Sequence, residues 1–179
     1  MRSSIIIVAL AIAPTAARAE VVTAAPAGFE VKEAATIAAP PEKLWPVLMT
    51  PQHWWSSDHT WSGDAANLYM DHQATGCFCE KLPNKGSVEH ARLIFVDPGK
   101  TLRMTGALGP LQAEAATGTL TITLAPDGDG ATKVTFDYIV GGYIRAGAEG
   151  IAPAVDAVLA QQLAGLKAAA EAAPAAPAS

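Results

Sequence analysis

The stretch GIAPAVDAVLAQQLAGLKAAA, from Gly150 to Ala170, decides the fold expected for this chain. Its large apolar residues recur every three or four positions, at Ile151, Val155, Val158, Leu159, Leu163 and Leu166. This spacing predicts one long amphipathic helix of about five turns. The helix is expected to be the last ordered element, because residues 172–179 have the Ala- and Pro-rich composition of a disordered tail.

The ordered part of the chain is expected to begin with a strand. Residues 29–38 alternate between apolar and polar positions, which predicts a half-buried strand. Pro40 and Pro41 end this strand, and Pro41 suits the start of a short helix over residues 42–49. A second short helical turn is expected to follow from Pro51.

Between these helices and the last one, the pattern is typical of about six antiparallel strands. Turn-forming clusters at residues 83–86, 97–100 and 127–130 separate short apolar runs between residues 68 and 140. Segregated strands and helices indicate an α+β fold. We therefore expect a curved antiparallel sheet wrapped around the long C-terminal helix, with two short helices after the first strand and room for a cavity between sheet and helix.

The N-terminus has the pattern of a secretory signal peptide over residues 1–19. Arg2 precedes the apolar run of residues 5–13, which is shorter than the roughly 20 residues needed to span a bilayer. The expected cut follows Ala19, which predicts a periplasmic or secreted protein without stable membrane insertion. Residues 20–28 are then expected to be a flexible leader, and residues 29–171 a single domain.

Composition narrows the classes of partner. The net charge is −5, and no basic patch is present, so nucleic acid is not an expected partner. All four Trp, all four His and both Cys lie between Trp45 and His90, so any site is expected to use that quarter of the chain. The chain has no HExxH motif, nucleophile elbow or phosphate loop, so we favour binding over catalysis and expect no cofactor.

Cys77 and Cys79 leave three interpretations open. Residues i and i+2 of a regular strand are roughly 6.6 Å apart, whereas the Cβ atoms of a disulfide are about 3.8 Å apart. This favours two free thiols packed as small apolar groups, since a bridge would need a bulge at Phe78. A third interpretation places Cys79 or Glu80 across a hairpin from His90, so that Cys77, Cys79 and His90 could ligate a metal.

Two glutamates, Glu80 and Glu33, are expected to have a functional or a buried side chain. Glu80 and His90 are either an ordinary cross-strand polar pair or an acid/base pair. Glu33 is in phase with the apolar residues of the first strand, so it is expected to point inward and to need a partner. Arg92 and Arg103 are the candidates for that partner.

Several of these segments resemble the START-like, birch-allergen-like SRPBCC superfamily, whose members have the helix-grip fold. The resemblance extends from Phe29 to Glu171 and is closest to the branch that includes the C-terminal domain of the heat-shock-protein ATPase activator. The segments that carry it are the opening strand leading into residues 39–45, Pro51 through Trp54-Trp55 to His59, residues 76–80, residues 96–100, residues 106–111 and the closing helix.

The resemblance implies a cavity for a hydrophobic ligand between sheet and long helix. It does not transfer catalytic residues, because superfamily members share none. A heat-shock ATPase partner is not expected for an exported chain. We therefore predict an exported protein that binds a small hydrophobic or lipid-like molecule, with a cyclase- or hydrolase-like enzyme using Glu80 and His90 as the alternative. The residues predicted to contact the ligand are Trp54, Trp55, Trp61, Tyr69, Phe78, Glu80, His90, Met104, Leu108, Tyr138 and Tyr143.

Overall fold

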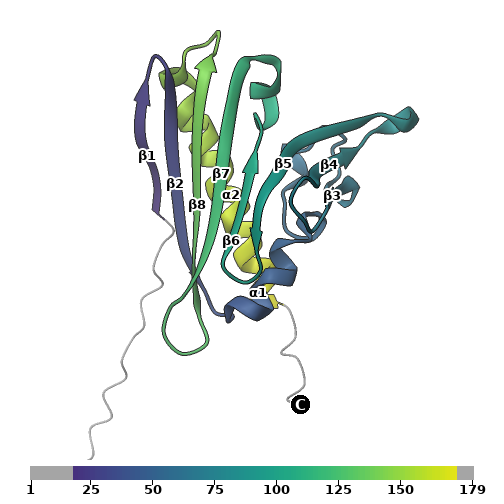
Figure 1. Cartoon of the computed structure of the whole chain (residues 1–179), viewed down its shortest axis with the longest axis vertical. Helices are drawn as coiled ribbons and strands as arrows, with labels where there is room; N and C mark the ends of the chain where they lie inside the picture. The colour runs from purple at the N-terminus through teal and green to yellow at the C-terminus, as the bar shows by residue number, and fades with distance from the viewer. Residues whose placement is uncertain (1–17, 173–179) are drawn as a thin grey trace, which may run out of the picture.

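The computed structural model describes residues 18–172 and has one antiparallel sheet of eight strands, in the order β1-β2-β8-β7-β6-β5-β4-β3. The long helix α2 (Ala148–Ala172) lies along one face of this sheet, and α1 (Pro41–Leu48) lies near one end (Figure 1). The predicted α+β helix-grip arrangement is confirmed. The strands are β1 (Arg18–Ala25), β2 (Gly28–Ile37), β3 (Leu68–Met70), β4 (Cys77–Lys81), β5 (Ser87–Asp97), β6 (Thr101–Thr105), β7 (Ala115–Pro126) and β8 (Thr132–Tyr143).

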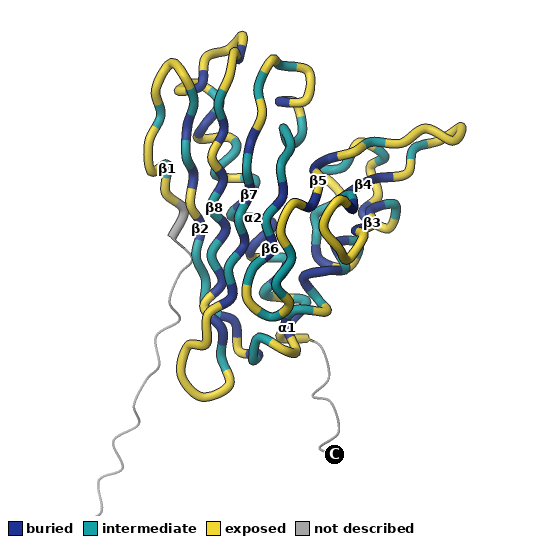
Figure 2. The backbone as a smooth tube through the Cα atoms, viewed as in Figure 1, coloured by how far each residue is buried: buried dark blue, intermediate teal, exposed yellow. Residues whose placement is uncertain are grey.

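The core lies between the sheet and α2. Residues of β7 and β8 alternate between buried and more exposed positions, as expected of strands with one covered face (Figure 2). The buried residues of α2 include Leu159, Leu163 and Leu166, which recur at helical spacing. The residues that form the core between sheet and α2 are therefore those that recur with period 2 in the strands and period 3.6 in the helix.

Strand β1 is a departure from the sequence-based expectation. Residues 20–28 were expected to be a flexible leader, but residues 18–25 pair antiparallel with β2, and the pairs include Val21 with Val31. Val21, Val22 and Thr23 are β-branched and favour strands. The predicted cut after Ala19 would fall inside β1, whereas the rest of the predicted signal peptide, residues 1–17, lies outside the described residues.

The segment between α1 and β3 is made of short 3₁₀ turns, of which η1 (Pro51–His53), η2 (Ser57–His59) and η3 (Ala65–Asn67) succeed one another. It packs closely on α2, where a Cβ atom at Gly165 would lie 2.2 Å from the carbonyl oxygen of Trp54. Glycine at this position therefore allows the backbone after η1 to approach the helix. Two further turns are η4 (Pro83–Lys85) and η5 (Gly109–Ala113).

Strands β3 to β5 splay away from the rest of the sheet (Figure 1). Strand β5 is irregular at two points, since its pairing register shifts between Phe78 and Cys79 of β4 and again between Leu93 and Phe95 beside β6. Such bulges bend a strand and redirect its side chains. Within residues 18–172, no helix is long and apolar enough to cross a membrane.

Candidate functional site

A pocket of about 280 Å³ lies between the N-terminal half of α2 and two loops of the sheet side. One loop contains η2, and the other leads into η5; the ring of His90 on β5 completes the wall. The lining residues are Trp55, Asp58, His59, Thr60, Trp61, His90, Leu108, Gly109, Pro110, Ile151, Ala154, Val155, Val158 and Leu159. The pocket is thus mainly apolar, with a few polar groups at defined places.

Helix α2 contributes one continuous face to the pocket. Ile151, Ala154, Val155, Val158 and Leu159 are spaced by three or four residues, so they project from the same side of the helix. Toward the C-terminus this face continues into the fully buried core. The N-terminal half of the helix therefore lines the pocket and also packs on the sheet, where Asp156 lies beside Glu33 of β2.

The loop that carries η2 is tied to α2 by side-chain amides. The backbone N–H of Ser56 donates to Oε1 of Gln162 at 2.8 Å, and Nε2 of His59 contacts Oε1 of Gln161 at 2.8 Å. The indole N–H of Trp55 donates to the carbonyl of His59 at 3.1 Å, which orders the loop internally. These bonds hold the loop against the same helix that forms the opposite wall.

Glu80 anchors the other end of this loop from β4. Its carboxylate is fully buried and accepts hydrogen bonds from the backbone N–H groups of Trp61, at 3.0 Å, and Ser62. It also contacts Nε2 of His90 at 2.9 Å. Burial raises the pKa of Glu80, but the bonds from Ser62, Trp61 and His90 together outweigh it and hold that pKa below the ordinary value.

His90 occupies a bulge of β5. Phe78 pairs with Ala91 and Cys79 pairs with Glu89, so His90 has no partner in the ladder. As a result, His90 and Ala91 are both buried in succession, which regular alternation would prevent. The ring packs on Phe78 with centroids 5.0 Å apart, and burial lowers the pKa of His90 although the carboxylate of Glu80 opposes this.

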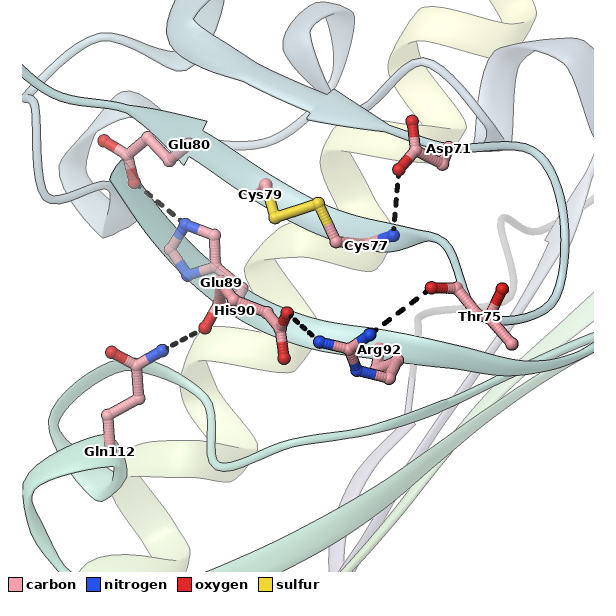
Figure 3. The surroundings of a disulfide bond; sticks show 9 residues. All are labelled: Asp71, Thr75, Cys77, Cys79, Glu80, Glu89, His90, Arg92 and Gln112. Carbon is pink, nitrogen blue, oxygen red and sulfur yellow. Dashed lines mark hydrogen bonds and ion pairs between the residues drawn. A yellow bond between two sulfur atoms is a disulfide. The ribbon is translucent and has the colours of Figure 1, made fainter. Parts of the chain in front are cut away.

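The cysteines differ from the favoured expectation of two free thiols. Cys77 and Cys79 form a disulfide with a Cα–Cα distance of 5.5 Å, shorter than the roughly 6.6 Å of a regular strand (Figure 3). A bulge was expected to be necessary for this disulfide, and a bulge is present. Its extra residue is His90 on β5, however, and not Phe78 between the two cysteines. The proposed ligand set of Cys77, Cys79 and His90 is therefore wrong, because bonded sulfurs supply no thiolate.

The register expected for this hairpin was also wrong. Cys79 lies opposite Glu89 and Glu80 opposite Val88, so neither faces His90 in the ladder. The Glu80–His90 contact is formed nonetheless, through the bulge. Among residues 18–172, no cluster of three or more His, Cys, Asp or Glu side chains could hold a metal ion.

The structure gathers only part of the predicted ligand contacts at the pocket. Four of the eleven predicted residues line it: Trp55, Trp61, His90 and Leu108. Four others are buried in the core instead: Trp54, Phe78, Met104 and Tyr138. Tyr69 and Tyr143 are exposed and do not line the pocket, and Glu80 contacts His90 without being part of the lining.

Two of the core residues still shape the pocket. Phe78 packs edge-on against the ring of Trp55, with centroids 5.2 Å apart. The hydroxyl of Tyr138 donates to the carbonyl of Gly106 and accepts from the N–H of Leu108, which fixes the loop that carries Leu108. Burial raises the pKa of Tyr138 to about 12, so this hydroxyl remains protonated.

Sequence reasoning missed the contribution of α2. Ile151, Val155, Val158 and Leu159 were recognised as one apolar face but interpreted only as core. Asp58 and His59 also line the pocket.

Glu33 points inward as expected, but its neighbour is another carboxyl group and not Arg92 or Arg103. Glu33 is fully buried, and neither of its oxygens has a hydrogen-bond partner among the described residues. Burial, followed by the neighbouring carboxyl group of Asp156 on α2, raises the pKa of Glu33 to about 8. With this pKa, Glu33 is mostly protonated at neutral pH, which avoids a second negative charge beside Asp156.

Residues 28–171 match the sequence profile of the family described as polyketide cyclase/dehydrase and lipid transport. The chain belongs to this family. This family is part of the SRPBCC superfamily, so the predicted superfamily is confirmed. The resemblance to the branch of the heat-shock-protein ATPase activator stays a prediction. None of the curated proteins compared with the chain matches it.

Three solved structures show the same fold as this chain. Protein MLL2253 from Mesorhizobium loti is 22% identical, with a TM-score of 0.56 over 78% of this chain and 95% of its own. A conserved protein of unknown function, EF2215 from Enterococcus faecalis, is 16% identical, with a TM-score of 0.60 over 90% and 80%. CalU16 from Micromonospora echinospora is 14% identical, with a TM-score of 0.58 over 88% of each chain.

Proposed function

We propose that this protein binds a small apolar molecule in the pocket between α2 and the η2 and η5 loops. The observation that carries this proposal is the lining itself, in which Trp55, Leu108 and one face of α2 surround a single buried polar ring, that of His90. Membership of a family described by cyclase, dehydrase and lipid-transport functions supports a ligand-binding role.

The size of the pocket limits the ligand. A cavity of about 150 Å³ holds benzene, so about 280 Å³ suits a molecule of roughly twice that size. A bicyclic aromatic or a branched chain of about ten carbons fits this volume, whereas a diacyl lipid does not fit inside it. We therefore expect the ligand to be a small aromatic or terpene-sized molecule.

The test uses naphthalene as the probe and Trp fluorescence as the signal, since Trp55 and Trp61 both line the pocket. Val158→Phe adds volume on the lining face of α2, whereas Ala157→Phe makes a similar addition at an exposed position outside the lining. The proposal predicts at least tenfold weaker binding for Val158→Phe and little change for Ala157→Phe. Equal binding by both variants, or no binding by the wild type, would contradict it. Native mass spectrometry of the purified protein would then identify the natural ligand.

Export is part of the same proposal. The supporting observation is the pattern of residues 1–19, and the expected mature chain begins at Glu20. Cell fractionation followed by N-terminal sequencing tests this directly. A chain that starts at Met1 and remains in the cytoplasmic fraction would contradict it.

A second function is supported by one specific observation. A buried carboxylate that orients a His ring at a pocket wall is also the arrangement of an acid/base pair, here Glu80 and His90. If the natural ligand is converted by the protein, His90→Gln should lower turnover by about 10²-fold or more. Quantitative recovery of unchanged ligand after long incubation would eliminate this second function.

A further inference from the structure

We propose that the pocket selects ligands that carry a hydrogen-bond donor, such as a phenol, enol or alcohol, and that Nδ1 of His90 is the acceptor that recognises it. This inference rests on the proposed function and specifies the chemical class of its ligand. It follows from the contacts of Glu80, the state of the His90 ring and the other polar groups of the pocket.

The contacts of Glu80 determine which nitrogen of His90 carries the proton. The carboxylate already accepts two backbone N–H groups, from Trp61 and Ser62, and an ionised carboxylate has no proton to donate. Its third contact, with Nε2 of His90, therefore requires Nε2 to be the donor. In a neutral imidazole with its proton on Nε2, Nδ1 carries a lone pair and acts only as an acceptor.

The position of the ring leaves this acceptor for the pocket. His90 is only 6% exposed, and its ring belongs to the pocket wall. Figure 3 shows its second ring nitrogen turned away from Glu80. No residue within the described part of the chain forms a hydrogen bond with Nδ1. Nδ1 is not among the fully buried polar atoms of the described residues that lack a partner, so it is accessible from the pocket. A bound ligand that does not donate to Nδ1 would leave this acceptor desolvated and unpaired, so a ligand that does donate gains from the pairing.

The other polar groups of the lining point to the same preference. Asp58 adds a carboxylate at the pocket, while the hydroxyl of Thr60 is engaged with the carbonyl of Ser57 at 2.8 Å. The indole of Trp55 donates to the carbonyl of His59, and Nε2 of His59 contacts Oε1 of Gln161. This leaves the indole N–H of Trp61, a residue that is 55% exposed, as the side-chain donor of the lining without a partner within the described part of the chain. The pocket thus offers acceptors and negative charge, which disfavours a carboxylate ligand and favours a neutral donor.

The test compares three probes of similar size: 2-naphthol, 2-methylnaphthalene and 2-naphthoate. The relevant quantity is the ratio of the dissociation constants for 2-methylnaphthalene and 2-naphthol, measured by calorimetry in wild type and in His90→Phe. Phenylalanine retains an aromatic ring against Phe78 but removes the acceptor. The ratio should fall by about two- to tenfold in His90→Phe, the range that one net hydrogen bond produces, and 2-naphthoate should bind most weakly to the wild type.

The control is His53→Phe, which makes the same change at an exposed position outside the lining and should leave the ratio unchanged. An unchanged ratio in His90→Phe, or tightest binding of 2-naphthoate, would overturn the inference while leaving the pocket as a binding site. Failure of all three probes to bind the wild type would overturn the proposed function as well.

A second measurement needs no variant. Long-range proton–nitrogen correlation spectra of protein labelled with ¹⁵N-histidine distinguish the two neutral tautomers. We expect the His90 signal at pH 8 to show a protonated Nε2 and an unprotonated Nδ1. A proton on Nδ1 would refute the inference, even in a protein that binds every probe.

Discussion

Glu80 and His90 are joined by a 2.9 Å hydrogen bond although they do not oppose each other in the β4–β5 ladder. The contact exists because His90 is the extra residue of a bulge, which turns it inward beside Ala91. The same carboxylate accepts the backbone N–H groups of Trp61 and Ser62 from the pocket loop. Glu80 therefore couples the position of the loop to the orientation of the His90 ring.

Replacing the carboxylate should show this coupling. Glu80→Gln leaves one acceptor oxygen where three donors converge, so at least one buried N–H group loses its partner. We expect the free energy of unfolding to fall by about 1–3 kcal/mol, measured by urea denaturation at pH 7.5. The same variant should also bind naphthalene more weakly, because the loop loses its anchor.

The matched control for this variant is Glu89→Gln on the neighbouring strand. Glu89 is exposed and its side chain pairs with Arg92 at the surface, so removing its charge should change stability by no more than about 0.5 kcal/mol. A similar loss of unfolding free energy in both variants would mean that Glu80 stabilises the fold only through its negative charge and not through its hydrogen bonds.

The pH dependence of the His90 contribution has a definite sign. Burial lowers the pKa of His90 in the folded protein, so the unfolded chain takes up the proton first as the pH falls. The contribution of His90 is therefore complete above the ordinary His range, near pH 6.5, and is lost below it. The stability difference between wild type and His90→Phe should be larger at pH 8 than at pH 5; the opposite trend would indicate a charged ring in the folded state.

Much of the fold was predictable because its elements are periodic over many residues. Helix α2 and strand β2 were expected within two residues of their observed starts, since apolar patterns of period 3.6 and 2 extend over most of each element. Strand β1 was missed because Ala and Pro surround its short β-branched run. It forms through pairing with β2, a tertiary effect that local composition does not show.

The site was less predictable than the fold for a related reason. A one-residue bulge changes which side chains face inward, and nothing in residues 87–92 marks where it falls. This single shift accounts for the wrong hairpin register and for the inward position of His90. The aromatic residues predicted to contact the ligand lie partly in the core, partly in the pocket lining and partly on the surface. The size of a side chain alone does not distinguish these environments.

The buried carboxyl group of Glu33, beside Asp156 of α2, gives a pH dependence opposite to that of His90. The pKa of Glu33 is raised to about 8, so the folded protein retains a proton that the unfolded chain releases above the ordinary Glu range. Stability should therefore decrease as the pH rises from about 4.5 to 8. Glu33→Gln removes this loss and should be more stable than wild type at pH 9 by about 1 kcal/mol or more. Glu30→Gln, on the other face of β2, is the control and should show no such gain.

Two glycines of α2 should respond to substitution in opposite directions. Gly→Ala in a helix usually stabilises by roughly 0.5–1 kcal/mol, and Gly150 has open space around its Cβ position. At Gly165 the added Cβ would lie 2.2 Å from the carbonyl oxygen of Trp54. Gly150→Ala should raise the melting temperature, whereas Gly165→Ala should lower it and weaken naphthalene binding by displacing the loop after η1. A gain in both variants would contradict the close packing of this loop on α2.

The disulfide between Cys77 and Cys79 should contribute only modestly to stability, because it closes a very short loop. In the chain-entropy model, a loop of three residues is worth about 1.6 kcal/mol, against roughly 3 kcal/mol for fifteen residues. The ladder pairs Phe78–Ala91 and Cys79–Glu89 hold the two strands together independently of the bridge. The variant with Cys77→Ser and Cys79→Ser should therefore lose about 1–2 kcal/mol in urea denaturation and keep its affinity for naphthalene within about threefold. Loss of binding in a variant that remains folded would show instead that the bridge, rather than strand pairing, maintains the bulge and the inward position of His90.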